Sequence, residues 1–223
     1  GALIARGTPT SPIVFTSNAP SPAPGDWQGI YFRDDTNDVS TTLEYCRIEY
    51  GGHTNNANIY CDGASPTITN SIIKYSSGHG IYLNNSSPTI TNCEIRDANE
   101  NGIYLVANSR PLIGGVGNGN TIADCGAYAV FCQDSTCYPE IAYNNISDYG
   151  SYALRISAGT NILNNTYSGA GTRAIEVMGG NIDADRTWGN DMPVYIVTGN
   201  ITIQHSSFYQ LVTLTIEPGV EVR

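Results

Sequence analysis

Residues 65–83 read SPTITNSIIKYSSGHGIYL, and the chain repeats much of this pattern immediately afterwards. The hexapeptide SPTITN at residues 65–70 returns at residues 87–92, and GIYL at residues 80–83 returns at residues 102–105. Both offsets are 22 residues. A fixed period of this length, built from short alternating runs, is typical of a chain that coils and stacks on itself.

Each copy has the residue pattern of β-strands separated by turns. Apolar and polar residues alternate in TIT at residues 67–69 and in IYL at residues 81–83, which indicates strands with one buried face. Asn, Gly and Ser lie between these runs and favour turn conformations. One coil cannot bury its apolar residues alone, whereas stacked coils can. The sequence therefore predicts an all-β fold, a parallel β-helix (solenoid) of about eight or more coils.

Asparagine recurs at the start of successive copies. Residues 120–131, 145–156 and 165–177 each run from an asparagine to an alternating strand. Stacked asparagines satisfy turn amides and one another by hydrogen bonding. We therefore expect an internal ladder at one corner, formed by Asn70, Asn92, Asn120, Asn145 and Asn165.

The composition excludes several classes of partner. The net charge is −10 and only 13% of the residues are charged, so binding to nucleic acid or to an anionic membrane through charge is not expected. No apolar run approaches the roughly 18 residues of a membrane-spanning helix, so we expect no membrane insertion. The expected partners are polysaccharide and attached domains of the native chain.

The six cysteines show no spacing of a metal site. Cys61 and Cys132 fall at the inward position that Leu83 occupies in the repeat, where buried thiols are expected. Cys132 and Cys137 are close enough in sequence for a loop disulfide, and the pairing stays open.

A column of outward side chains is the strongest candidate for a binding surface. If the apolar residues Ile30, Ile59, Ile81, Ile103 and their successors point inward, the residue after each points outward. These outward residues are Tyr31, Tyr60, Tyr82, Tyr104, Phe131, Arg155, Glu176 and Tyr195. The first five are aromatic and lie roughly 4.8 Å apart along the axis. With polar neighbours such as Asn84, Asp62 and Gln133, such a stripe suits stacking on sugar rings. The alternative is that the rings only stabilise the sheet, or that a loop covers them.

Acidic residues cluster in one turn, where Asp34, Asp35 and Asp38 lie within five residues. Carboxylates on loops can bind Ca²⁺, but the cluster does not match a calcium-binding loop. We therefore expect solvated turn carboxylates and no cofactor, with calcium as the alternative.

The ends of the chain resemble secreted bacterial right-handed β-helix repeat proteins, including adhesin-type and carbohydrate-binding modules. The segments that carry the resemblance are VTGNITI at 197–203, LTIEPGVEVR at 214–223, GALIARGTPTSPIVFTS at 1–17 and DADRTWG at 183–189. In those proteins the first two segments precede the third, whereas here they lie at the C-terminus. The resemblance implies a right-handed β-helix at the cell surface or secreted. It also leads us to expect residues 1–223 to be a single domain excised from a longer multidomain chain.

Three fragments resemble β-helical polygalacturonases. SGHG at residues 77–80 is similar to the GHG of that family, the RDD of residues 33–35 offers paired carboxylates, and RIS at residues 155–157 is similar to its RIK. Candidate catalytic residues are therefore His79, Asp34 and Asp35. However, Asp35 and His79 are 44 residues apart, about two coils rather than one, and the NTD element of that family is missing. A hydrolase needs two carboxylates that flank one bond, and the sequence does not place them.

From these observations we expect a non-catalytic module that binds a plant cell-wall glycan such as xylan or pectin, appended to a larger secreted bacterial protein. The binding residues would be Tyr31, Tyr60, Tyr82, Tyr104, Phe131, Asn84 and Asp62. The first alternative is a structural stalk or adhesin segment. The second is a polysaccharide lyase or glycoside hydrolase.

Overall fold

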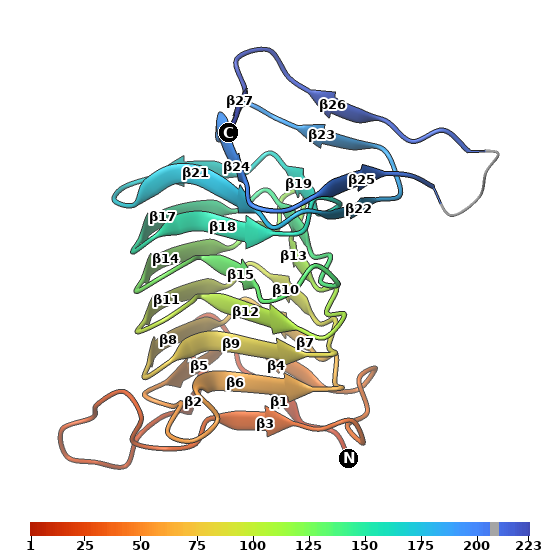
Figure 1. The fold of residues 1–223 in the computed structure, drawn as a ribbon. Helices are drawn as coiled ribbons and strands as arrows, with labels where there is room; N and C mark the ends of the chain where they lie inside the picture. Colours follow the sequence, from red (N-terminus) through yellow and green to blue (C-terminus); the bar gives the residue numbers. More distant parts are fainter. Residues whose placement is uncertain (206–209) are drawn as a thin grey trace.

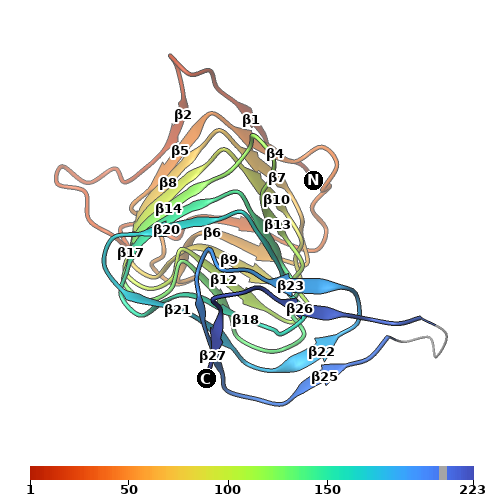
Figure 2. The same ribbon diagram turned by 90° about the horizontal axis from the view of Figure 1, so that it is seen from above.

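The computed structural model describes residues 1–205 and 210–223, and their strands wind into a stack of coils (Figure 1). The named strands pair in parallel with the equivalent strands one turn away. Viewed down the stack, three sheets form the sides of the coil (Figure 2). The described residues include no helix, and hence none that is long and apolar enough to cross a membrane. The predicted all-β parallel β-helix is confirmed.

Each regular turn of the helix contributes one strand to each sheet, and the third sheet continues for two further strands. The first sheet contains β1 (Ile4–Arg6), β4 (Thr42–Glu44), β7 (Thr67–Thr69), β10 (Thr89–Thr91), β13 (Leu112–Gly114), β16 (Glu140–Ala142) and β19 (Asn161–Leu163). The second sheet contains β2 (Ile13–Phe15), β5 (Cys46–Glu49), β8 (Ile72–Ser76), β11 (Glu94–Ala98), β14 (Thr121–Cys125), β17 (Asn145–Tyr149) and β20 (Thr166–Ser168). The third sheet contains β3 (Ile30–Phe32), β6 (Ala57–Asp62), β9 (His79–Asn84), β12 (Ile103–Val106), β15 (Val130–Cys132), β18 (Tyr152–Ile156), β21 (Thr172–Val177), β24 (Val194–Val197) and β27 (Glu221–Val222).

The stack has about seven regular turns, fewer than the eight or more that the sequence predicts. After β21, the chain forms two separate ladders, which project from the C-terminal end of the stack (Figure 1). One pairs β22 (Gly180–Ile182) with β25 (Ile201–Ile203), and the other pairs β23 (Arg186–Trp188) with β26 (Leu214–Ile216). The change begins at Gly179 and Gly180, whose φ angles of 93° and 114° favour glycine.

The core is a set of aliphatic columns that run along the axis of the helix. In the third sheet Ile59, Ile81 and Ile103 are aligned and fully buried. The 22-residue repeat explains this alignment, because equivalent positions of successive coils pair directly in a parallel in-register stack. Burial of each such side chain contributes on the order of 2 kcal/mol.

The predicted asparagine ladder is wrong in its membership. Within the described residues, a column of hydrogen-bonded asparagines consists of Asn120, Asn144 and Asn165. All three are buried at the corner between the first and second sheets. Asn120 donates from its backbone N and from Nδ2 to Asn144 Oδ1, both at 2.9 Å. Asn144 donates in the same way to Asn165 Oδ1, again at 2.9 Å.

The other three predicted members lie one residue away from this column. Asn70 and Asn92 precede the buried position and adopt left-handed conformations, with φ of 50° and 53°. Asn145 follows the buried position and is exposed at the start of β17. Because neighbouring side chains point in different directions, an offset of one residue moves the amide from the inside of the helix to its surface.

The cysteines are buried and none is in a disulfide. Cys61 aligns with Leu83, and Cys132 aligns with Leu105, so both fill the inward position predicted for them. Cys46 and Cys93 occupy earlier rungs of the polar corner column, where the Cys93 amide donates to Asn120 Oδ1 at 2.9 Å. Burial raises the pKa of the Cys93 thiol to about 12, so the thiol stays protonated.

Candidate functional site

The predicted aromatic column is present on the outer face of the third sheet. Strand pairing aligns its members across β3, β6, β9, β12 and β15. We use the name aromatic column for Tyr31, Tyr60, Tyr82, Tyr104 and Phe131. Tyr31 is 42% exposed, and the other four side chains are partly buried.

The rings of the column stack on one another. Tyr60 and Tyr82 have ring centroids 4.5 Å apart with planes inclined by 13°, and Tyr104 and Phe131 are 5.3 Å apart at 6°. Tyr31 instead meets Tyr60 edge-on at 4.9 Å. The faces of the inner rings are therefore occupied by neighbouring rings. Ring edges and phenol hydroxyls, rather than ring faces, are available to a ligand, which corrects the expectation of direct stacking on sugar rings.

Beyond Phe131 the column continues with an ion pair. Arg155 aligns with Phe131, and Glu176 with Arg155, as predicted. Arg155 Nε lies 3.1 Å from Glu176 Oε1, and the guanidinium carbon lies 4.8 Å from the Phe131 ring centroid. The predicted outward position of Tyr195 is wrong, because Tyr195 pairs with the inward Ile175 and is 2% exposed. The register differs here since the chain between β21 and β24 no longer follows the regular coil.

A flanking column lies beside the aromatic column, and of its members the sequence pointed only to His79. The flanking column consists of His79, Asn101, Tyr128 and Tyr152. Each member precedes a small residue and then an inward aliphatic residue, as in His79-Gly80-Ile81 and Tyr128-Ala129-Val130. A Cβ on Gly80 would lie 2.6 Å from Gly102 O and 2.8 Å from Ile95 Cγ2, so Gly80 faces the core. The recurrence of a small residue before each inward aliphatic residue is the sequence pattern that could have revealed this column.

His79 is held in one arrangement by its neighbours. Its Nε2 lies 3.2 Å from Glu100 Oε2, and its Nδ1 lies 3.3 Å from the Asn101 backbone N, which donates to it. The imidazole also stacks on the Tyr104 ring, with centroids 4.3 Å apart. A neutral imidazole with the proton on Nε2 satisfies both contacts, because Nε2 then donates and Nδ1 accepts.

Burial lowers the pKa of His79 from 6.5 to about 4. Glu100 attracts the protonated ring, but its side chain is 49% exposed and solvent screens this attraction. A second proton on the ring would have to bind at Nδ1, where the backbone N–H of Asn101 already donates a hydrogen bond. The His79 side chain is thus neutral, packed and only 3% exposed. A solvent-accessible acid or base has a different arrangement.

We expect this histidine to make the protein less stable in acid. Below about pH 6.5 the unfolded chain binds a proton that the folded chain does not bind until about pH 4, so stability falls through this window. The loss should reach about 2–3 kcal/mol. Urea unfolding between pH 7 and pH 4 measures it. His79→Gln should flatten the profile relative to wild type, whereas His53→Gln, at an exposed position, should leave it unchanged. Equal profiles for all three proteins would contradict the expectation.

A polar hollow lies at the Tyr31 end of the aromatic column. Its volume is about 350 Å³, and it is lined by Arg33, Asp34, Asp62, Gly63, Asn84 and Asn85. Asp62 accepts hydrogen bonds from Tyr31 Oη and from Asn84 Nδ2, each at 2.8 Å. The structure therefore brings two of the predicted polar residues, Asp62 and Asn84, to the end of the column.

The predicted catalytic and metal residues are spread over several sites. Asp34 lines the polar hollow, whereas the carboxylate that contacts His79 is Glu100. Asp35 is exposed, and its backbone O accepts from the N-terminal amine. Asp38 Oδ1 accepts from Ser65 N at 2.7 Å. Within residues 1–205 and 210–223, no group of three or more His, Cys, Asp or Glu side chains is arranged to hold a metal ion.

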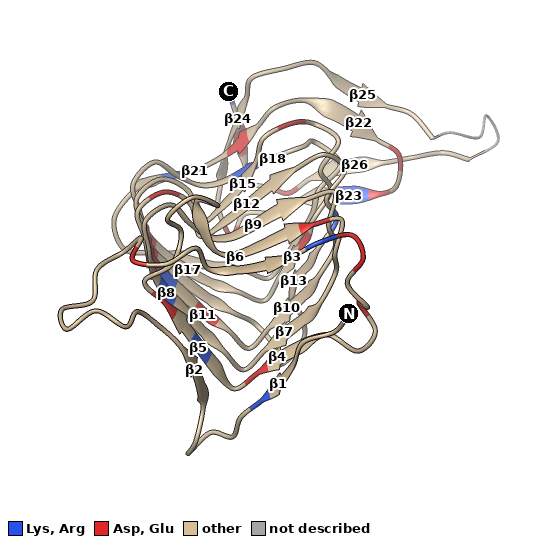
Figure 3. Cartoon of the chain, turned by 90° about the horizontal axis from the view of Figure 1, so that it is seen from below, with Lys and Arg blue, Asp and Glu red and all other residues tan. Residues whose placement is uncertain are grey.

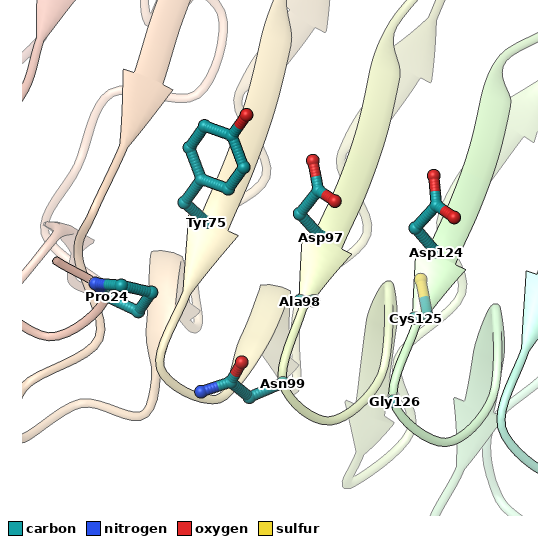
Figure 4. Close-up of a pocket in the computed structure, with 8 residues that line it drawn as sticks. All are labelled: Pro24, Tyr75, Asp97, Ala98, Asn99, Asp124, Cys125 and Gly126. Atoms are coloured by element: carbon teal, nitrogen blue, oxygen red, sulfur yellow. The ribbon is translucent and has the colours of Figure 1, made fainter.

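A second hollow lies where the second sheet turns toward the third (Figure 4). Tyr75, Asp97 and Asp124 project side by side from successive turns, and Pro24 stands at one end. Tyr75 also stacks on Tyr50, with ring centroids 5.1 Å apart. Asp97 is paired with Arg96. This arrangement is a second aromatic stack away from the aromatic column, and it offers a matched control for substitutions there.

Comparison with known protein families places residues of this site within a matched family region. A family model described as the right handed beta helix region matches residues 28–185, a range that contains the whole aromatic column. No curated protein and no solved structure matches the chain.

Proposed function

This chain belongs to the right-handed β-helix family, and from that premise we propose that it binds an extended polysaccharide along the third sheet without cleaving it. The observation that supports the proposal is the unbroken alignment of the aromatic column, with a polar hollow at one end and an Arg–Glu pair at the other. Repeating groups at the strand spacing suit a ligand that is itself a repeating chain. A plant cell-wall glycan such as xylan or pectin fits this description.

The column would recognise sugar hydroxyls through the edges of its rings. Tyr31 Oη and Tyr104 Oη already donate to Asp62 and Gln133, at 2.8 Å and 2.6 Å. Burial raises the pKa of Tyr60 to about 12, so its hydroxyl keeps its proton and can donate. A partly buried hydroxyl in a fixed ring loses little freedom on binding. Tyr60 and Tyr82, which stack near the centre of the column, are the residues we expect to contribute most.

A comparison of hydroxyl removal with ring removal tests the proposal. Tyr60→Phe with Tyr82→Phe keeps the stack but removes two hydroxyls, each worth about 0.5–1.5 kcal/mol as a hydrogen bond. Binding should therefore weaken roughly tenfold or more. Tyr60→Ala with Tyr82→Ala should nearly abolish it. The measurement is retardation in gels that contain a polysaccharide, over a panel of plant cell-wall glycans.

The matched control is Tyr50→Phe with Tyr75→Phe, which alters the other stacked pair and should leave retardation unchanged. If the Phe variant of the column binds like wild type while the Ala variant does not, the rings themselves rather than their hydroxyls contact the sugar. If wild type is retarded by no glycan, the polysaccharide proposal is wrong.

A structural role is the second candidate, and one specific observation favours it. The rings are in mutual contact, and a stacked pair contributes about 0.5–1.5 kcal/mol beyond its buried area. The column would then stabilise a stalk or adhesin segment. In either role we propose a secreted or cell-surface module, appended to further domains of a larger bacterial protein.

A further inference from the structure

We propose that the ligand of the third sheet is an uncharged polysaccharide and that the surface discriminates against chains of uronic acids. The inference rests on the proposed function and specifies its ligand class. It separates the two candidates suggested by the sequence, since xylan backbones are neutral whereas pectate carries a carboxylate on its sugars.

Carboxylates adjoin the aromatic column along its length. Asp62 contacts Tyr31 at one end, and Glu100 pairs with His79, which stacks on Tyr104 near the middle. Glu176 accepts from Tyr128 Oη at 2.8 Å at the other end. These oxygens can accept hydrogen bonds from sugar hydroxyls. The Asp62 and Glu100 carboxylates would repel a ligand carboxylate, since like charges placed together across an interface are strongly unfavourable, whereas Glu176 is already paired with Arg155.

The two arginines that adjoin the column, Arg155 and Arg33, have carboxylates near them. Arg155 pairs with Glu176 and also donates to the backbone O of Cys132 at 2.8 Å. Arg33 lies 6.0 Å from the Tyr31 ring centroid, and it shares the polar hollow with the carboxylates of Asp34 and Asp62. His79 remains neutral because burial lowers its pKa to about 4. An acidic chain would therefore meet guanidinium groups that have carboxylates beside them.

Two further basic side chains, Arg47 and Lys74, lie on a different face, whereas Arg173 lies on β21 of the third sheet, beyond the aromatic column. Figure 3 shows blue positions on β5 and β8 of the second sheet, and a blue position followed by red in the turn after β3. Arg47 and Lys74 of these strands share Glu49, whose Oε2 lies 3.3 Å and 3.8 Å from them. An extended chain bound along the third sheet does not reach these groups. The net charge of −10 adds a repulsion over longer distances, which salt screens.

The test compares neutral and acidic chains in the same retardation assay. Wild type should be retarded by at least one neutral glycan, such as arabinoxylan, with little dependence on salt. Retardation by polygalacturonate at low salt should be at least roughly tenfold weaker. Asp62→Asn with Glu100→Gln should raise retardation by polygalacturonate at low salt. The control Glu140→Gln, on the exposed face of the first sheet, makes the same kind of charge change and should have no effect.

The outcomes separate the two proposals. Polygalacturonate binding equal to or stronger than neutral binding would overturn the inference and leave polysaccharide binding intact. Retardation only by a cationic chain such as chitosan would also overturn the inference and leave polysaccharide binding intact. Retention by none of the polymers would overturn the proposed function, and the inference with it.

Discussion

Replacing Asn144 by alanine should lower the free energy of unfolding by about 3–5 kcal/mol, because it leaves several buried polar groups without partners at about 1–3 kcal/mol each. Asn144 is fully buried. Its Oδ1 accepts from two donors of Asn120, and its Nδ2 donates to Ile113 O at 3.0 Å and to Asn165 Oδ1 at 2.9 Å. Water cannot replace these bonds without entry into the core. Urea unfolding followed by circular dichroism measures the loss.

The matched control is the adjacent Asn145→Ala. Asn145 is exposed, and its Oδ1 accepts only one described side-chain hydrogen bond, from Thr166 at 2.7 Å. The Asn145→Ala substitution should lower the free energy of unfolding by less than about 1 kcal/mol. Similar losses for the two variants would contradict the position of the ladder, and a larger loss at Asn145 would support the assignment that the sequence suggested.

Replacing Trp188 by alanine should cost about 3–5 kcal/mol, the usual range for a buried aromatic side chain. Trp188 is 2% exposed and stacks on Tyr195, with ring centroids 4.8 Å apart and planes inclined by 2°. The effect should be local, because each coil of a solenoid contacts only its neighbours. Hydrogen exchange should accelerate in β22, β24 and β25 while β9 and β12 stay protected.

Leu211→Ala provides the control, since it also shortens an apolar side chain near this end of the chain but acts on a residue that is 97% exposed. It should change stability by less than about 0.5 kcal/mol. If Trp188→Ala accelerated exchange equally in β9 and β12, the last strands would unfold together with the regular stack, and the expectation of a local effect would be wrong.

Several features of the third sheet could be predicted from the sequence because the repeat length and the two-residue alternation of strands act together. The repeat sets which residues of successive coils pair, and the alternation sets which of them face outward. The 22-residue repeat aligned Tyr60, Tyr82 and Tyr104. Coils of other lengths were aligned by their alternating strands, in which an inward aliphatic residue precedes the outward one, as at Tyr31 and Glu176. This alignment failed at Tyr195, where the coil changes after Gly179 and Gly180 and the register changes with it.

Corners and contacts between coils required the tertiary structure. A turn residue in the left-handed region does not continue the alternation, so the sequence placed Asn120 and Asn165 correctly but put the other three ladder members, Asn70, Asn92 and Asn145, one residue away from the buried column. The sequence also could not show that the phenol rings would stack on one another. That depends on side-chain torsions, which the strand spacing allows but does not determine.

The sequence by itself thus determined the parallel stack and the residues of the aromatic column, because these depend on local alternation that recurs once in each coil. Only the tertiary structure decided that ring edges face the solvent, that His79 pairs with Glu100 and that Tyr128 reaches Glu176. Each of these contacts joins residues from different coils, and its geometry depends on how the turns place one coil above the next.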